Sequence, residues 1–385
     1  MKHLEPIYAD FASSAPPLPE VVDAMMEWLG GSHANPHADH LPGHRAARAI
    51  DDARQHIGDL LDADPDGVIF TSGATESNNL ALKGLAGNCI GGLYFSSLDH
   101  SSIVEVAHHL AETGQCRVGR LQHDAQGSIS PAAVKSALTT GRGRALVALA
   151  HGNNEIGTIQ VLSEIGAAIS GEGHLFHVDA SQTAAHVPIS VQDMRISTLS
   201  ISGHKLYGPA GIGALWLDPT LKTELSPLLH GGGQQGGVRS GTVPTYLAVG
   251  LGVAARLARD RMGQARAHLQ AMASQFIGAL ASHGISPVVI GHPSDRLPGH
   301  LSVRFPGAGA PDLLARLLPL LAVSSGAACS AGELRASRVL RALGLDEETA
   351  SEGLRISFGR STTAKEVAQA AEYMSDAVRE VLDSI

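Results

Sequence analysis

The sequence predicts an α/β protein with a mainly parallel sheet and a second, smaller α+β domain. Its 385 residues, at roughly 150 residues per domain, favour two domains. Short apolar segments alternate along the chain with longer amphipathic ones, and small or polar residues close most of the short segments. This alternation is typical of a sheet that is covered by helices on both faces.

Six short segments are predicted to be strands of the large sheet, because each is rich in β-branched or aliphatic residues. They are apolar almost throughout, as the strands of a parallel sheet buried on both faces must be. The six segments are residues 68–71, 93–96, 145–150, 175–178, 198–200 and 212–217. Between them, apolar residues at i, i+3 and i+4 predict helices at 46–61, 76–85, 101–111 and 131–138.

The last third of the chain begins with a predicted long helix over 245–283, which we expect to contain a break. Beyond it, the patterns predict strands at 287–290, 301–305 and 354–358 and helices at 311–318, 337–343 and 364–382. We expect residues 14–257 to form the large domain, and residues 1–13 together with 258–385 to form the small one.

The composition excludes several classes of protein. With 28 Lys+Arg against 37 Asp+Glu the net charge is −9, which argues against a nucleic-acid binder. The 44% hydrophobic content supports a packed core, and only three cysteines exclude a disulfide scaffold and fit a reducing compartment. We see neither a signal peptide nor an apolar stretch of about 18 residues, so we expect a cytoplasmic protein without a membrane span.

The residues that follow each predicted strand are where a ligand site is expected, since open α/β sheets bind ligands beyond the carboxyl ends of their strands. The segment 72–75 (Ser-Gly-Ala-Thr) lies between a strand and a helix. Free amides at a helix start, together with hydroxyl groups, favour an anion such as phosphate. The alternative for this segment alone is an ordinary helix N-cap.

Lys205 and Asp179 carry the clearest chemical signal. Lys205 lies among small residues after a strand, where a lysine can lose hydration and become a neutral nucleophile. Asp179 follows another apolar strand, and a buried carboxylate needs a cationic partner. A protonated pyridine nitrogen is such a partner, so the pair predicts pyridoxal 5'-phosphate as cofactor. For an arbitrary lysine, a surface position would be the usual interpretation.

The chain resembles the cysteine desulfurases, within the fold type I pyridoxal-phosphate enzymes (class V aminotransferase-like). The resemblance runs from about Tyr8 to Arg360 and rests on several motifs in family order: GATESNN, NNEIGTIQ, HVDASQ, SGHKLYGPAG, RSGT, SSGAACS and LRISFGR. It implies a large cofactor-binding domain with a seven-stranded-type sheet, and a small domain that carries a catalytic cysteine loop.

The resemblance also implies roles for single residues. Lys205 would hold the cofactor and shuttle the Cα proton, and Asp179 would pair with the ring nitrogen. His100 would stack on the ring, although a core histidine is the alternative. The ring oxygen would lie near Gln182 and Asn154, with Asn154 also reaching the substrate. The residues that would hold the phosphate are Ala74, Thr75, Ser202 and His204.

Two further residues are assigned by the same resemblance. Thr242 would reach the phosphate of the neighbouring subunit's cofactor, which implies a homodimer. Arg355 would bind the substrate carboxylate in a two-pronged ion pair, for which the planar guanidinium is suited.

The three cysteines differ in their surroundings. Cys89 and Cys116 lie in ordinary turns, whereas Cys329 lies in a run of small residues that leaves a thiol uncovered. The resemblance makes Cys329 the nucleophile that takes sulfur from L-cysteine, leaving L-alanine and a persulfide. The region around Cys329 resembles the subgroup with the longer, mobile cysteine loop. The persulfide would pass to an acceptor protein for iron–sulfur cluster, thio-cofactor or tRNA biosynthesis.

Other functions compete with this interpretation. Selenocysteine lyase differs by one substrate atom, and other pyridoxal-phosphate lyases or aminotransferases share the fold but have no use for Cys329. A non-catalytic sulfur-transfer scaffold would not need Lys205. The chain stops at Ile385, so docking of an iron–sulfur scaffold protein on a longer tail is in doubt. We expect no metal site in the histidine cluster formed by His33, His37, His40 and His44, because prolines interrupt any helix through it.

Overall fold

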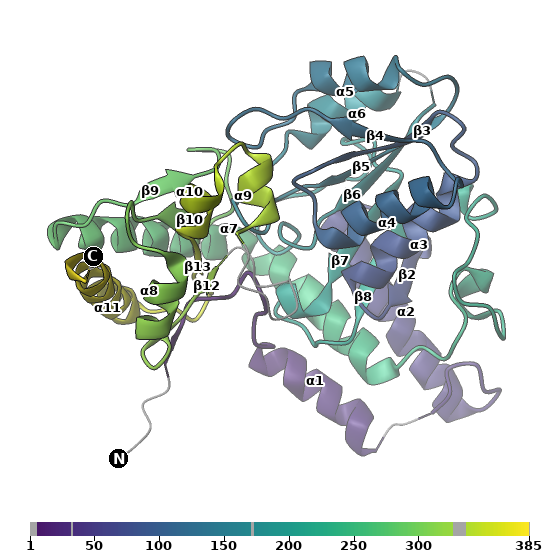
Figure 1. The fold of residues 1–385 in the computed structure, drawn as a ribbon. Coiled ribbons are helices and arrows are strands. Elements are labelled where there is room, and N and C mark those ends of the chain that lie inside the picture. The colour runs from purple at the N-terminus through teal and green to yellow at the C-terminus, as the bar shows by residue number, and fades with distance from the viewer. Residues whose placement is uncertain (1–5, 32–33, 171–172, 326–335, 385) are drawn as a thin grey trace.

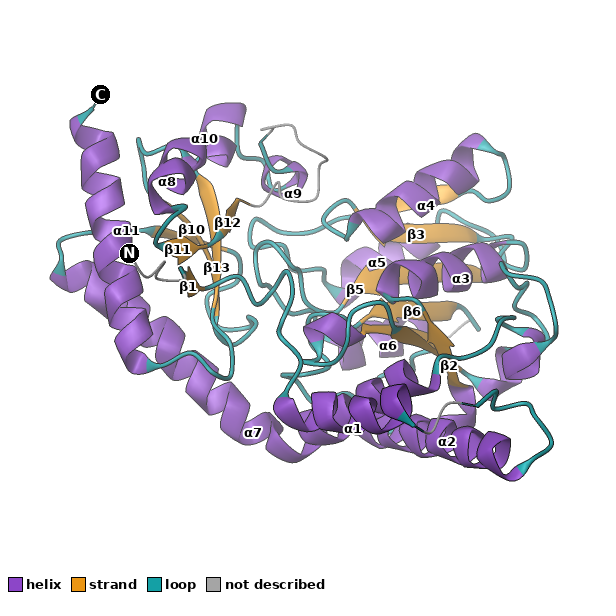
Figure 2. Cartoon of the chain, turned by 90° about the horizontal axis from the view of Figure 1, so that it is seen from below, coloured by secondary structure: helices purple, strands orange, loops and turns teal. Residues whose placement is uncertain are grey.

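The computed structural model describes residues 6–31, 34–170, 173–325 and 336–384. A large sheet with its helices and a smaller sheet with its own helices lie side by side, and the long helix α7 (Thr245–Ser282) runs between them (Figure 1; Figure 2). This confirms the predicted α/β class.

The large sheet has seven strands in the order β2-β8-β7-β6-β5-β3-β4, and it is parallel except for β8, which runs antiparallel to both neighbours. All six predicted strands are present. The prediction missed β4, a short edge strand whose residues are mostly half-buried or exposed and therefore lack an apolar pattern. The strands are β2 (Val68–Thr71), β3 (Gly92–Ser96), β4 (Val118–Leu121), β5 (Ala145–Ala150), β6 (Leu175–Asp179), β7 (Thr198–Ser202) and β8 (Gly213–Leu217).

Both faces of this sheet are covered, as the continuous apolar strands require. In β5, Val147 and Leu149 point into one core while Leu146 and Ala148 point into the other. The core of Val147 is covered by α1 (Pro19–Gly30), α2 (Leu41–Leu61), α5 (Pro131–Leu138), α6 (Leu162–Ile169) and the first half of α7. The core of Leu146 is covered by α3 (Ala74–Ala86) and α4 (Ser101–Glu112). The prediction missed α1 and α6.

Helix α7 is continuous over 38 residues, so the predicted break is wrong. Two of its glycines allow close packing against other helices. A Cβ at Gly250 would lie 2.7 Å from the sulfur of Met25 in α1, and one at Gly252 would lie 2.6 Å from the Cα of Ala53 in α2. The helix passes position 257 without interruption, and its two halves pack into different hydrophobic cores.

The smaller sheet is antiparallel, with the order β12-β13-β10-β9, and the pair β1-β11 is parallel. The four strands of this sheet are β9 (Val288–Ile290), β10 (His300–Arg304), β12 (Ser324–Ser325) and β13 (Gly353–Ser357), and the separate pair consists of β1 (Ile7–Tyr8) and β11 (Leu321–Ala322). The surrounding helices are α8 (Ala310–Leu317), α9 (Arg338–Ala342), α10 (Glu347–Ser351) and α11 (Ala364–Asp383). Strand β1 brings the start of the described chain into this smaller part, next to β13.

The described residues also contain short 3₁₀ helices, namely η1 (Pro65–Gly67), η3 (Gly203–Lys205), η4 (Pro219–Leu221) and η5 (Gln234–Gly237). In the histidine cluster, His40 accepts from the Gly43 amide at the start of α2, and His44 contacts Asp39. Among the described residues, which do not include His33, no group of three ligand side chains could hold a metal ion. No helix of the described ranges is long and apolar enough to cross a membrane.

Candidate active site

A cavity of about 470 Å³ lies where β5, β6 and β7 end. It brings together all the predicted site residues except Thr242 and Cys329. Those that line it are Ala74, Thr75, His100, Asn154, Asp179, Gln182, Ser202, His204, Lys205 and Arg355. Thr242 is exposed and does not line the cavity of its own chain, and Cys329 lies outside the described residues.

One end of the cavity is formed by the start of α3. Gly73 precedes the helix with φ 155°, and the first residues of the helix, Ala74 and Thr75, line the cavity. A Cβ at Gly213 of β8 would lie 2.7 Å from the Cα of Gly73, so only glycine lets the strand and this loop approach so closely. The positive helix end therefore faces an open space that suits a phosphate.

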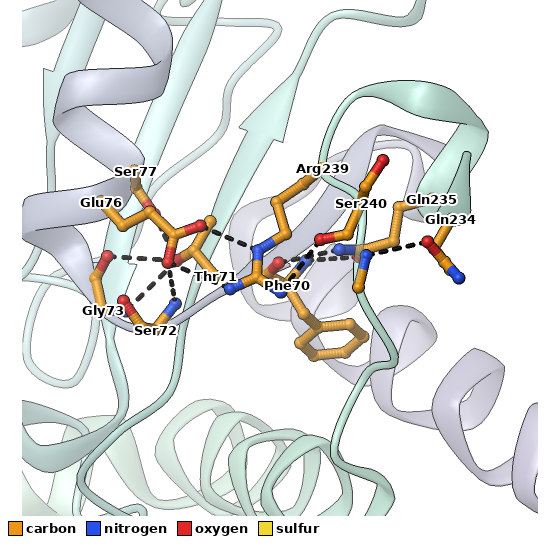
Figure 3. Close-up of polar contacts among 11 residues, drawn as sticks. Phe70, Thr71, Ser72, Gly73, Glu76, Ser77, Gln234, Gln235, Arg239 and Ser240 are labelled. Atoms are coloured by element: carbon orange, nitrogen blue, oxygen red, sulfur yellow. Dashed lines mark hydrogen bonds and ion pairs between the residues drawn. The ribbon is translucent and has the colours of Figure 1, made fainter. Parts of the chain in front are cut away.

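The same loop is tied to the chain segment that leads to Thr242 (Figure 3). Arg239 donates to Glu76 of α3 at 2.8 Å, and Glu76 accepts the Ser72 amide at 2.7 Å. Although burial opposes it, the Arg239 charge and the Ser72 hydrogen bond hold the pKa of Glu76 below its usual value. Gln235 bonds both the amide and the carbonyl of Phe70 in β2, which anchors the segment to the sheet edge (Figure 3).

The carboxylate of Asp179 is held by neutral donors. It accepts from the Ser181 amide at 2.9 Å and from Asn78 Nδ2 at 2.8 Å. Burial would raise the pKa of Asp179, but the Ser181 bonds, the nearby His100 and the Asn78 bond bring it below its ordinary value. Asp179 is therefore an anion that can hold a protonated ring nitrogen.

Asn78 links Asp179 to a buried chain of side chains. Because its amide nitrogen donates to Asp179 and Ser102, its oxygen must accept from His177 Nε2, at 3.0 Å. His177 Nδ1 then accepts from the Thr198 hydroxyl at 2.8 Å. Burial lowers the pKa of His177 to about 4, so the ring is neutral and both of its nitrogens are satisfied.

His100 is oriented by the same hydrogen bonds. Its Nδ1 accepts from the Ser102 amide at 3.1 Å and contacts the Ser102 hydroxyl at 2.8 Å. The proton of the neutral ring is therefore on Nε2. Burial lowers the pKa of His100, and the charge of Lys205 acts in the same direction. The proposed role of His100 in proton transfer would use this Nε2–H group.

Lys205 ends η3, directly after β7, and lines the cavity with Asp179. On the neighbouring wall, Gln182 Nε2 donates to the carbonyl of Ala12 at 2.9 Å. His204 Nδ1 lies 3.3 Å from the Ser14 hydroxyl, and burial lowers its pKa. The segment 12–14 from the N-terminus thus forms one side of the site.

Arg355 of β13 forms the other end of the cavity and is 5% exposed. It donates to the carbonyl of Asn154 at 3.0 Å, to Asp10 at 2.7 Å and to the hydroxyl of Ser13. His300 Nε2 donates to the same Asn154 carbonyl at 3.2 Å. The backbone carbonyl of Asn154 therefore orients Arg355. The sequence had predicted a different role for Asn154, close to the cofactor ring oxygen and the substrate.

The two described cysteines lie away from the cavity. Burial raises the pKa of Cys89 to about 12, and it also raises that of the half-buried Cys116. Neither sulfur is a thiolate at neutral pH, which a nucleophile must be.

The prediction did not assign roles to the residues that orient the site, namely Asp10, Ser13, Asn78, Ser102, His177 and His300. Asn78 and His177 belong to quoted motifs, GATESNN and HVDASQ. Both are polar residues within otherwise apolar, buried elements. Because a buried polar group needs a hydrogen-bond partner, this pattern could have identified them as site residues.

The residues fit pyridoxal 5'-phosphate. The helix start suits its phosphate, Asp179 suits its ring nitrogen, and Lys205 lies on the same cavity to bind its aldehyde. Arg355 Nε is buried and has no hydrogen-bond partner within the described ranges, so the guanidinium retains capacity for a ligand carboxylate.

Known proteins resemble this chain over almost its full length. The family model for class-V aminotransferases matches residues 7–369. Cysteine desulfurase IscS of Rickettsia bellii is 38% identical over 382 residues, covering 98% of this chain and 92% of the relative. A NifS-like protein of known structure has a TM-score of 0.87 at 27% identity, covering 99% of this chain and 100% of its own. The structure of SspA in complex with cysteine has a TM-score of 0.80 at 36% identity, covering 94% and 100%. The chain therefore belongs to the class-V aminotransferase family and, within it, to the pyridoxal-phosphate-dependent cysteine desulfurases.

Proposed function

We propose that Lys205, Asp179, Arg355 and Cys329 perform the cysteine desulfurase reaction in this chain. The observation that carries the proposal is the shared cavity. Asp179 ends β6, Lys205 follows β7 and Arg355 lies within β13 of the smaller sheet, yet all three line one space beside an anion-binding helix start. L-cysteine offers an amine, a thiol and a carboxylate, and Arg355 is suited to bind the carboxylate.

Pyridoxal 5'-phosphate, when bound, stabilises negative charge at the substrate Cα. Asp179, as an anion, keeps the ring nitrogen protonated, which strengthens that effect. The Lys205 amine then accepts the proton of the substrate Cα and returns it to the carbon skeleton. His100 offers its Nε2–H toward the same space.

Cys329 receives the sulfur in this proposal. Its thiolate attacks the substrate sulfur, an S–S bond forms, and the bond from Cβ to sulfur breaks. The Cβ carbon keeps the bonding electrons and takes up a proton, so L-alanine leaves and a persulfide stays on Cys329. Carbon is reduced as sulfur is oxidised, and no external oxidant is needed.

We further propose a homodimer in which Thr242 reaches the phosphate of the neighbouring subunit's cofactor. The exposure of Thr242 and the anchoring of its segment through Arg239 support this (Figure 3). The acceptor of the persulfide is a sulfur-carrier or iron–sulfur scaffold protein. We also propose that the protein is cytoplasmic. We propose that residues 14–257 form the large domain and that residues 1–13 and 258–385 form the small one.

Mass spectrometry after cysteine treatment tests the central assignment. We expect one added sulfur on Cys329, and Cys329→Ala should bind cysteine but release almost no sulfur. Lys205→Ala should lose the cofactor's yellow absorbance. The matched control is Cys116→Ala, which should desulfurate cysteine as the wild type does. Added sulfur on Cys89 or Cys116 would overturn the assignment.

A further inference from the structure

Of the three nitrogens of the Arg355 guanidinium, Nη2 has both of its hydrogens engaged in hydrogen bonds. Nη2 donates both hydrogens, one to Asp10 at 2.7 Å and one to the Ser13 hydroxyl. Nη1 donates one hydrogen to the Asn154 carbonyl at 3.0 Å, and Nε has no partner among the residues that the structure describes. A carboxylate that binds arginine with two parallel bonds needs Nη2 together with either Nη1 or Nε. When such a ligand binds, Nη2 must therefore lose its hydrogen bond to either Asp10 or Ser13.

The hydrogen bond to Ser13 is the one that a ligand can replace. Ser13 and Arg355 both line the cavity, whereas Asp10 is not among the described residues that line it. A ligand carboxylate entering from the cavity therefore meets the Ser13 hydroxyl first. A hydroxyl forms a weaker bond to a guanidinium than a carboxylate does, so the exchange is favourable.

Asp10 is held firmly on the side away from the cavity. Its second carboxylate oxygen accepts from the Ser324 hydroxyl at 2.7 Å. Its carbonyl accepts from the Ser13 amide at 3.0 Å and from the Tyr8 hydroxyl at 3.1 Å, which closes a turn beside β13. The Asp10 and Arg355 side chains are only 16% and 6% exposed, so each neutralises the other away from water.

We propose that Asp10 is a positioning residue that fixes the Arg355 guanidinium, while the Ser13 hydroxyl occupies the place of one substrate carboxylate oxygen. This inference rests on the role proposed for Arg355. Asp10 stays paired with Arg355 when substrate binds, and Ser13 is displaced. The N-terminal segment thereby contributes to the recognition of the α-carboxylate, which neither Lys205 nor Asp179 contacts.

Two amines separate this role from general damage to the site. L-alanine has the α-carboxylate and ethylamine lacks it, and both can react with the holoenzyme through their amine. Binding of each is measured by titrating the cofactor absorbance of holoenzyme. We expect Asp10→Ala to weaken L-alanine binding about tenfold and to leave ethylamine binding within twofold.

Asp10→Asn is the conservative variant, since an amide still accepts from Nη2 and can donate to Ser324. It should bind L-alanine within threefold of wild type. Ser13→Ala should bind L-alanine as tightly as wild type or more tightly, because no hydroxyl has to be displaced.

Several results would overturn the inference. They are unchanged or tighter L-alanine binding in Asp10→Ala, equal losses for both amines, or a tenfold loss in Ser13→Ala. Arg355→Gln tests the underlying assignment separately. If that variant binds L-alanine like wild type, the role of Arg355 itself is wrong, whatever the Asp10 variants do.

Discussion

Replacement of Asn78 by alanine removes the side chain that connects Asp179, Ser102 and His177. Asn78 is fully buried and makes hydrogen bonds at 2.8 Å to Asp179, 2.8 Å to Ser102 and 3.0 Å to His177. Asn78 does not itself line the cavity, whereas its partners Asp179 and Ser102 do. The expected effects are therefore on the charge of Asp179 and on stability.

The magnitude follows from these contacts. A hydrogen bond to a charged group contributes about 1.5–3 kcal/mol to stability. Because the Asn78 bond favours the ionised carboxylate, its loss should raise the pKa of Asp179. The His177 Nε2–H group and the Ser102 hydroxyl also lose a buried partner, at about 1–3 kcal/mol each. The free energy of unfolding should therefore fall by at least about 3.5 kcal/mol, which is the sum of the three lower limits.

Two measurements check this prediction. Urea unfolding gives the loss of stability, and the pH dependence of kcat/KM gives the shift of Asp179. Because Asp179 must be ionised to hold the ring nitrogen, activity should begin to fall at a higher pH than in wild type as the pH is lowered.

The matched control is Asn79→Ala. Asn79 is the next residue of the same helix, and its side chain donates only to the exposed carbonyl of Thr75, at 2.9 Å. This control should change stability by less than about 0.5 kcal/mol. If Asn78→Ala behaves like Asn79→Ala in both measurements, the argument for a hydrogen-bonded Asp179 is refuted.

Two other predictions concern acid stability and the phosphate loop. Burial lowers the pKa of His151 and His177 to about 4 and those of His186 and His300 to about 3, whereas unfolded histidines titrate near 6.5. The unfolded state therefore binds these protons first, and at pH 5.5 the four histidines together lower stability by about 5 kcal/mol relative to pH 7.5. Burial raises the pKa of Asp99 to about 7, which acts in the opposite direction and offsets about 2 kcal/mol, so the net loss should be about 3 kcal/mol. Urea unfolding at both pH values checks this, and His186→Leu should reduce the pH effect, whereas an unchanged pH effect would contradict the assignment. Gly213→Ala should weaken pyridoxal-phosphate binding at least about tenfold in an absorbance titration, because the new Cβ would lie 2.7 Å from Gly73 Cα. Gly87→Ala has no neighbouring atom within 4 Å and a φ of −62°, so it should bind the cofactor normally, and equal binding in both variants would exclude the steric argument.

The predictable parts of the fold are those with a strong local pattern. Strands such as β5 are buried on both faces, so their sequences are apolar throughout and are recognised without tertiary information. Strand β4 lies at the edge and is mostly half-buried or exposed, so its four residues carry no such pattern. Helix α7 was predicted to contain a break, but it is continuous, and its Gly250 and Gly252 accommodate α1 and α2.

The sequence by itself determined the α/β class, the cofactor chemistry and most of the cavity-lining residues. Short motifs at strand ends carry that information, because parallel strands present their carboxyl ends at one edge. The tertiary structure decided how the site is oriented. Asn78 reaches Asp179 across 101 residues of chain, and Asp10 reaches Arg355 across 345. Hydrogen bonds between such distant residues leave no periodic signal in either segment, since they depend on how the two sheets and α7 pack together.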